Sequence, residues 1–264
     1  MRPAFALVAV LLALCGAAEA NDALGDARRF YNLAEYDAAE RSAREALATS
    51  PDAARVVLGR IRLERYRESA DPADLDEARS ALRLVDPRTL QPTERVELTI
   101  GLAEALYLED RFGAASELFE GSLETSELLG APAHERVLDW WASALDRLAQ
   151  RREPGDRGPI YRRVLERMEA EIARDPGSTP AGYWLAAAAR GAGDLDRAWS
   201  AAMAGWVRAS LARDRGAALR ADLDRLVVQA LAPERASRVP ARDRDQAIAG
   251  MLSEWEAFKA NWAR

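Results

Sequence analysis

One spacing of residues occurs three times along this chain of 264 residues and constrains its fold more than any other feature. Steps of 3 and 4 residues keep side chains on one face of a helix, and a step of 6 crosses a turn between two helices. Each set therefore predicts a helical hairpin whose helices touch through small residues. The sets, with steps of 3, 6, 3, 4 and 3, are Ala27, Phe30, Tyr36, Ala39, Ala43 and Ala46; Ala103, Leu106, Phe112, Ala115, Phe119 and Ser122; and Ala186, Ala189, Leu195, Ala198, Ala202 and Gly205.

Two further stretches carry weaker versions of this pattern. One lies between Pro51 and Pro87, and a polar loop over residues 69–74 lengthens its expected turn. The other begins near Ala133 and has a Gly- and Pro-rich insertion at 151–159. The small residues that mark the first helix of each hairpin are Ala27, Gly59, Ala103, Ala142 and Ala186. Their intervals of 32, 44, 39 and 44 residues are typical of stacked helix pairs.

The pattern changes after residue 213. One amphipathic helix is expected over 214–231, a polar stretch over 232–244, and a last helix over 245–262 whose apolar residues form one stripe. The end units of helical arrays are usually atypical because their outer face meets water. We therefore expect residues 214–264 to form a helical cap on the array.

These hairpins resemble the tetratricopeptide repeat, a family with a small residue, two aromatic or leucine positions, two alanines and a proline at fixed places. The resemblance covers about residues 21–213, and the second and fourth hairpins are degenerate. It implies an all-α fold, a right-handed α–α superhelix of about five hairpins in which the first helices line the concave face. Such repeats bind very different partners, so the resemblance does not identify one. The first hairpin matches in full, with Ala27, Phe30, Tyr36, Ala39, Ala46 and Pro51.

The first twenty residues have the features of a secretory signal peptide. Arg2 supplies the positive charge, residues 4–14 form an apolar run, and Ala18 and Ala20 fit a cleavage site. The run is shorter than the ~20 residues that a membrane span needs. We expect an exported protein, periplasmic or secreted, whose mature chain begins near Asn21.

Cys15, the single cysteine, lies inside this expected signal. Gly16 is compatible with a lipoprotein signal, whereas Leu14 fits one poorly. Ordinary cleavage would leave a mature chain without thiols, and therefore without disulfides. A lipid anchor at Cys15 stays open as the alternative.

Charge and composition exclude some functions. The net charge of −6 disfavours nonspecific binding of nucleic acid, so the expected partner is a protein or peptide. His134 is the sole histidine, and we expect it at the surface near a helix start. The sequence contains no Ser-His-Asp or Cys-His arrangement and no metal-binding loop motif. We therefore expect a non-enzymatic protein that uses neither a cofactor nor a metal.

The candidate binding residues are those that flank the small residue of each first helix. Tyr31 and Tyr107 occupy equivalent places, four residues after that small residue, and tyrosine offers a large contact area with a polar tip. The alternative is that such residues only pack between helices. The family's clamp for a carboxylate is not reproduced, because its positions hold Leu24, Arg28 and Asn32. The candidates are Arg28, Tyr31, Glu104, Tyr107, Ser143, Asp146, Tyr183 and Arg190.

All seven tryptophans lie at or after Trp140. We expect them to pack the core and the cap, and an exposed aromatic patch is the alternative. Two functional hypotheses follow. The first is an exported helical-repeat scaffold that binds a protein or peptide in the cell envelope. The second is a periplasmic repeat protein that binds a small ligand and accompanies an uptake system. The sequence leaves the oligomeric state open.

Overall fold

The segments that carry the repeated pattern of small residues fold into pairs of helices. The structure, a computed structural model, describes residues 23–262, and that range contains helices but no strand. The expected signal peptide and Cys15 lie outside the described residues. Two compact units divide the chain, one ending at Leu129 and the other beginning at Gly130.

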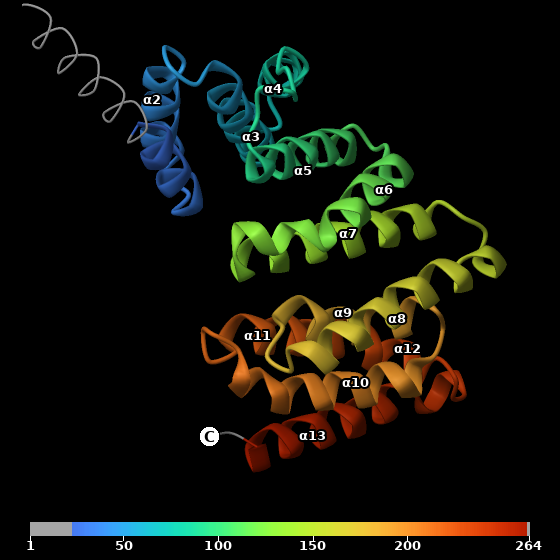
Figure 1. Ribbon diagram of the computed structural model, residues 1–264. Helices are drawn as coiled ribbons and strands as arrows, with labels where there is room; N and C mark the ends of the chain where they lie inside the picture. Colours follow the sequence, from blue (N-terminus) through green and yellow to red (C-terminus); the bar gives the residue numbers. More distant parts are fainter. Residues whose placement is uncertain (1–22, 263–264) are drawn as a thin grey trace, which may run out of the picture. The chain divides into compact units, whose positions relative to one another are not determined.

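The first unit contains three helix pairs (Figure 1). Prolines begin α3, α4 and α5, where a missing backbone N–H costs nothing. Its helices are residues 23–32, α2 (Tyr36–Ala46), α3 (Pro51–Ser69), α4 (Pro72–Arg83), α5 (Pro92–Leu108), α6 (Phe112–Leu123) and the short 3-10 turn η1 (Thr125–Leu129).

The second unit is also built from helices (Figure 1). They are α7 (Ala131–Gln150), α8 (Gly158–Arg174), α9 (Thr179–Gly191), α10 (Leu195–Arg208), α11 (Ala217–Leu226), α12 (Ala232–Ala236) and α13 (Arg244–Trp262). Short 3-10 turns, η2 (Pro154–Asp156), η3 (Ala209–Leu211) and η5 (Ala241–Asp243), and the π-helical η4 (Val227–Leu231) join them.

Helices pack neighbour to neighbour within each unit. In the first unit α3 contacts α2, α4 and α5, and in the second unit α9 contacts α7, α8, α10 and α11. Thus α3 touches its partner α4 and the next first helix α5, and α9 touches its partner α10 and the following helix α11. The expectation of an all-helical fold with sequential packing is confirmed.

The alanines of the repeated pattern lie where helices meet. Ala39, Ala115 and Ala198 have no exposed surface, and neither do Ala27 and Ala103. Small side chains allow two helix backbones to approach closely, and burial of apolar surface stabilises the contact. The prediction that small residues mark helix contacts is confirmed.

In four helix pairs the turn between the two helices repeats the same backbone conformation, and the connection between α7 and α8 does not share it. Ala34, Ala70, Asp110 and Gly193 each have a positive φ, between 55° and 82°, and each lies two residues before the second helix. This left-handed residue comes seven positions after the small residue of the first helix in the pairs marked by Ala27, Ala103 and Ala186. In the second pair it comes eleven positions after Gly59. The four extra residues extend α3 by one turn, to Ser69, and α4 begins at Pro72. The prediction of a polar loop over 69–74 was therefore wrong, because only residues 70 and 71 lie between the two helices. Asp71 instead caps α4 by accepting a hydrogen bond from the Ala73 N–H.

A second correction concerns residues 232–244. The helix expected to end at residue 231 continues through α12, and a π-helical segment precedes Pro233. Proline lacks an N–H and its ring clashes with the carbonyl four residues earlier in a regular helix. The wider π turn removes that conflict, since π-bulges relax the regular hydrogen-bond ladder.

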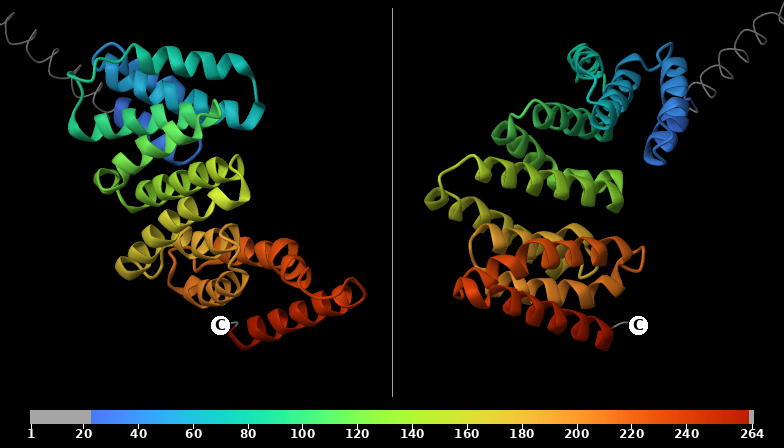
Figure 2. Two further views of the ribbon diagram at one scale, coloured as in Figure 1. Left: turned by 90° about the vertical axis from the view of Figure 1, so that its right-hand side faces the viewer. Right: turned by 180° about the vertical axis from the view of Figure 1, so that it is seen from behind.

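The last helix, α13, packs on α10 (Figure 2). Tryptophans of both helices take part in this contact. Trp255 is 1% exposed, and its ring lies edge-on to Trp206 with 5.4 Å between centroids. The packing interpretation is therefore confirmed for Trp199 of α10 and Trp255 of α13, whereas Trp262 at the end of α13 is 52% exposed. The expected boundary between array and cap at 213/214 falls inside the second unit. No helix among residues 23–262 combines the length and apolar character that a bilayer span requires.

Candidate functional site

The first unit presents paired charges on its first helices. Arg28 donates hydrogen bonds from Nη2 to Glu97 at 2.8 Å and to Glu94 at 3.2 Å. Burial by itself would lower the pKa of the Arg28 guanidinium, but the two carboxylates raise that pKa above its ordinary value. Arg28, a candidate from the sequence, thus ties residues 23–32 to α5.

A second ion pair lies beside the first. The Arg60 guanidinium carbon is 4.7 Å from the centroid of the Tyr31 ring, and Arg60 Nη2 is 3.4 Å from Glu104 Oε1. Burial lowers the pKa of Arg60, and the influence of Tyr31 and Glu104 raises it further than burial lowers it. Tyr31 donates its hydroxyl to Glu64 at 3.4 Å.

The sequence analysis missed Arg60, although a signal for it exists. Arg60 directly follows Gly59, as Arg28 follows Ala27 and Glu104 follows Ala103 in the same register. We call Arg28, Tyr31, Arg60, Glu97 and Glu104 the first-unit face.

The first-unit face encloses little space. Its recess has a volume of about 20 Å³, enough for about one water molecule. A partner would therefore contact this face from outside rather than enter it.

Tyr107 has mainly a packing role. Its ring lies edge-on to Phe112 with 5.1 Å between centroids, at the turn between α5 and α6. Tyr31 makes the equivalent contact with Tyr36 at 6.0 Å. The packing interpretation applies to both tyrosines at this point of the hairpin.

The second unit brings three of its four candidates together. Asp146 of α7 accepts a hydrogen bond from the Tyr161 hydroxyl at 2.8 Å. The Tyr161 ring occupies the space that a side chain at Gly191 would need, since a Cβ there would lie 2.3 Å from the ring. This packing places Asp146 next to the end of α9 and Arg190. The Arg190 side chain in turn binds Glu234 of α12, with 2.5 Å between Nη2 and Oε1.

Tyr183 lies among carboxylates on the same face. Its ring is edge-on to Trp184 at 5.4 Å, and the Trp184 indole N–H donates to Asp139 at 2.7 Å. Burial raises the pKa of the Tyr183 hydroxyl, and the negative charges of Asp222, Asp146 and Asp139 raise it further. We call Asp139, Asp146, Tyr183, Arg190 and Asp222 the second-unit face.

Two members of that face, Asp139 and Asp222, were not among the candidates. Asp139 precedes Asp146 by seven residues, two helical turns, and this spacing was the available signal. The remaining candidate, Ser143, is half-buried on α7 and forms no hydrogen bond within residues 23–262.

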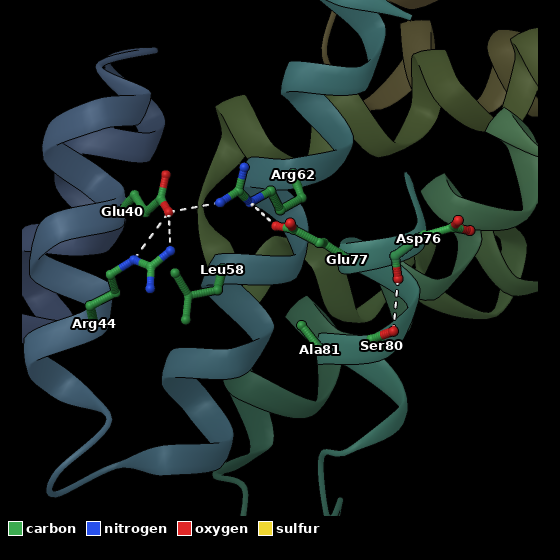
Figure 3. A pocket seen from close by; sticks show the side chains of 8 residues that line it. All are labelled: Glu40, Arg44, Leu58, Arg62, Asp76, Glu77, Ser80 and Ala81. Carbon is green, nitrogen blue, oxygen red and sulfur yellow. Dashed lines mark hydrogen bonds and ion pairs between the residues drawn. The ribbon is translucent and has the colours of Figure 1, made fainter. Parts of the chain in front are cut away.

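A larger groove lies on the second helices of the first unit (Figure 3). It has a volume of about 360 Å³ and runs between α2 and α4 with Leu58 of α3 exposed to it. The Glu40 carboxylate forms ion pairs with three arginines, whose Nη2 atoms lie 2.6 Å (Arg44), 2.9 Å (Arg62) and 2.6 Å (Arg65) from its oxygens. Burial raises the pKa of Glu40, but the three arginines bring it below its ordinary value.

His134 is not at the surface, so the expectation for it was wrong. Its side chain is 7% exposed and lies 3.4 Å from Glu171 of α8, with Arg174 Nη2 2.7 Å from the same imidazole nitrogen. A helix start is exposed only when no other helix covers it, and α8 packs on this turn of α7. Burial raises the pKa of Glu171, whereas His134 and Arg167 bring it below its ordinary value.

Comparison with family models, with characterised proteins and with solved structures finds no match to this chain. The case for function therefore depends on the two faces and the groove. Among residues 23–262, no three His, Cys, Asp or Glu side chains are placed to hold a metal ion.

Proposed function

We propose that this chain is an exported, non-enzymatic helical-repeat scaffold that binds a protein or peptide partner in the cell envelope. One observation carries the proposal. One side of the first helices holds charged and aromatic side chains in each unit, from Arg28 and Arg60 in the first to Asp146 and Tyr183 in the second.

The architecture proposed is a right-handed superhelix of five tetratricopeptide-like hairpins followed by the helical cap. Its support is the recurrence of two features in several pairs, the fully buried alanines and the left-handed turn residue. Since one helix pair cannot bury its apolar side alone, neighbouring pairs stack and leave one face of the first helices for a partner.

The form of the first-unit face favours an extended partner over an enclosed ligand. The recess of the first-unit face accommodates about one water molecule, whereas small-molecule sites usually have volumes of about 300–1,000 Å³. Aromatic and arginine side chains are enriched in protein interfaces, and both faces contain them.

The export part of the proposal has its own test. N-terminal sequencing of the protein from its source cells is expected to give a chain that begins at Asn21. A chain that begins with a lipid-modified Cys15 would support the anchored alternative. A chain that retains Met1 would contradict export by cleavage.

Partner binding is tested by capture with the full chain from an envelope extract. We expect one partner in stoichiometric amount, and expect Asp146→Arg to lose it. Glu166→Arg, an equal change of charge at an exposed position of α8, is the matched control and should retain the partner. Capture of no stoichiometric partner under gentle conditions would count against the proposal.

A small-ligand function is the second candidate, and the groove of Figure 3 favours it. Its volume of about 360 Å³ falls within the range of small-molecule sites. A ligand that binds the native state raises the melting temperature in a concentration-dependent way. Metabolites can be screened for a rise in the melting temperature of wild type and of Leu58→Trp, whose larger side chain fills the groove. A metabolite that raises the melting temperature of wild type but not of Leu58→Trp would support this candidate.

A further inference from the structure

On the second-unit face, carboxylates from separate helices surround an aromatic pair, Tyr183 and Trp184. Asp139 and Asp146 lie two turns apart on α7 and therefore on one side of it. Tyr183 has the same relation to Arg190 on α9. Because α9 packs against both α7 and α11, Asp222 of α11 joins this face.

Negative charge exceeds positive charge on this face. Asp146 accepts hydrogen bonds from the Tyr161 hydroxyl at 2.8 Å and from the Gln150 amide at 2.6 Å, and both donors are neutral. The arginines of this face are already paired with carboxylates. Arg190 Nε lies 2.9 and 3.0 Å from the two oxygens of Glu234, and Arg225 Nη1 lies 3.2 Å from Asp222 Oδ1. Their charges are therefore largely offset before a partner arrives, and Asp139 and Asp146 supply the excess negative charge.

The aromatic pair adds a second attraction for cations. Tyr183 is half-buried, and its hydroxyl forms no hydrogen bond in the described part of the chain. A ring face attracts a guanidinium or an ammonium group through its quadrupole, and nearby carboxylates strengthen this attraction. Tyr183 can also donate its hydroxyl to a partner's backbone carbonyl.

The spacing of the carboxylates selects an organic cation over a metal ion. A metal needs several oxygens at one point, and no such group of side chains occurs within residues 23–262. A guanidinium carries five N–H donors, and an ammonium three, at the end of a long side chain. Such a group can reach separate carboxylates at hydrogen-bonding distance.

We propose that the second-unit face docks a lysine or arginine side chain from a basic segment of the partner protein. This inference rests on the proposed function of partner binding. It adds the charge of the partner and the residues that recognise it. The occupant follows from charge complementarity, because a face with excess carboxylates around a tyrosine repels acidic segments.

The test measures the affinity of fluorescein-labelled twelve-residue peptides for the full chain by anisotropy. One peptide alternates arginine with glycine, and two matched peptides carry glutamine or glutamate in place of arginine. We expect the arginine peptide to bind at least tenfold more tightly than either matched peptide. Raising the salt concentration should weaken that binding.

Charge-matched variants locate the binding. We expect the double variant Asp146→Asn/Asp222→Asn to bind the arginine peptide about tenfold or more weakly than wild type does. Glu166→Gln with Glu254→Gln removes the same net charge from exposed positions on α8 and α13, and should change affinity less than twofold. Equal weakening in both double variants would show attraction to overall charge only and would overturn the inference. Preference for the glutamate peptide would overturn it as well.

The two proposals can fail separately. If the captured partner binds wild type and the Asp146→Asn/Asp222→Asn variant equally, the partner function stands and the assignment of a basic segment falls. If no partner is captured but the arginine peptide binds this face, the assignment of a cation site stands and the scaffold function falls.

Discussion

The Arg60 guanidinium lies 4.7 Å above the Tyr31 ring and pairs with Glu104 of α5. Three consecutive first helices of the first unit are thereby connected through one buried cation. Glu104 is 4% exposed, so water cannot replace Arg60 as its partner without rearrangement. This relationship makes Arg60 the position where the first-unit face is most sensitive to substitution.

Arg60→Met should lower the free energy of unfolding by about 3 kcal/mol, because it leaves the buried Glu104 carboxylate without its cation. Urea unfolding at pH 7, followed by circular dichroism, measures the change. Arg41→Met on α2 is the control, since Arg41 is exposed and forms no ion pair in residues 23–262. Adding Glu104→Gln to Arg60→Met should restore part of the loss. A loss below about 1 kcal/mol for Arg60→Met would contradict the account.

The ion cluster around Glu171 predicts a dependence of stability on pH. The folded pKa of Glu171 is below its ordinary value of 4.5, because His134 and Arg167 outweigh the effect of burial. Its stabilisation is present above about pH 4.5 and is lost as pH falls through the folded pKa.

The difference in free energy of unfolding between wild type and Glu171→Gln should therefore narrow as pH falls below 4.5. Urea unfolding at a series of pH values measures this difference. Glu166→Gln, at an exposed position on the same helix, should give no difference at any pH. A gap for Glu171→Gln that stays constant from neutral to acid pH would be inconsistent with this role.

Gly191 is required by the Tyr161 ring. A Cβ at this position would lie 2.3 Å from the ring, so Gly191→Ala should destabilise the chain by about 1–3 kcal/mol. Thermal unfolding measures the loss. In the background of Tyr161→Ala the same substitution should cost much less, because the ring is gone. Equal costs in both backgrounds would show that the contact is unimportant.

The repeated turn predicts substitutions of opposite sign. Ala34 and Ala70 have φ values of 58° and 55°, where an alanine is strained and a glycine is not. Ala34→Gly and Ala70→Gly should each raise the free energy of unfolding by about 0.5–1 kcal/mol, and Gly193→Ala should lower it by about 1 kcal/mol. Chemical unfolding of the three variants tests the set. Destabilisation by both glycines would contradict the equivalence of these turns.

The spacing of small residues was enough to predict the helix pairs. Ala39, Ala115 and Ala198 are buried because a helix contact leaves no room for larger side chains, and such a requirement is visible in a single sequence. The length of α3 was not predictable from this spacing. A turn with Pro72 and Asp71 has the composition of a loop, although both residues belong to the start of α4.

Features that depend on distant partners could not be predicted. The burial of His134 depends on Glu171, thirty-seven residues later, and no local pattern joins them. The continuation of the helix past Pro233 depends on a π turn that neighbouring helices stabilise. In the candidate site, Asp146, Tyr183 and Arg190 were predictable from their places beside the small residue of each first helix. Asp222 joins them only because α11 packs on α9, which the spacing does not indicate.

Site-specific photo-crosslinking in the source cells tests the central claim most directly, that the first-helix faces bind a partner. A benzophenone amino acid would replace Asn32, which lines the recess of the first-unit face, or Ser143, which lies between Asp139 and Asp146 on the same side of α7. Arg41 and Glu166 on second helices are the control positions. We predict that a protein is crosslinked from Asn32 and Ser143 and not from Arg41 or Glu166. Crosslinks from Arg41 and Glu166, with none from the two face positions, would contradict the account.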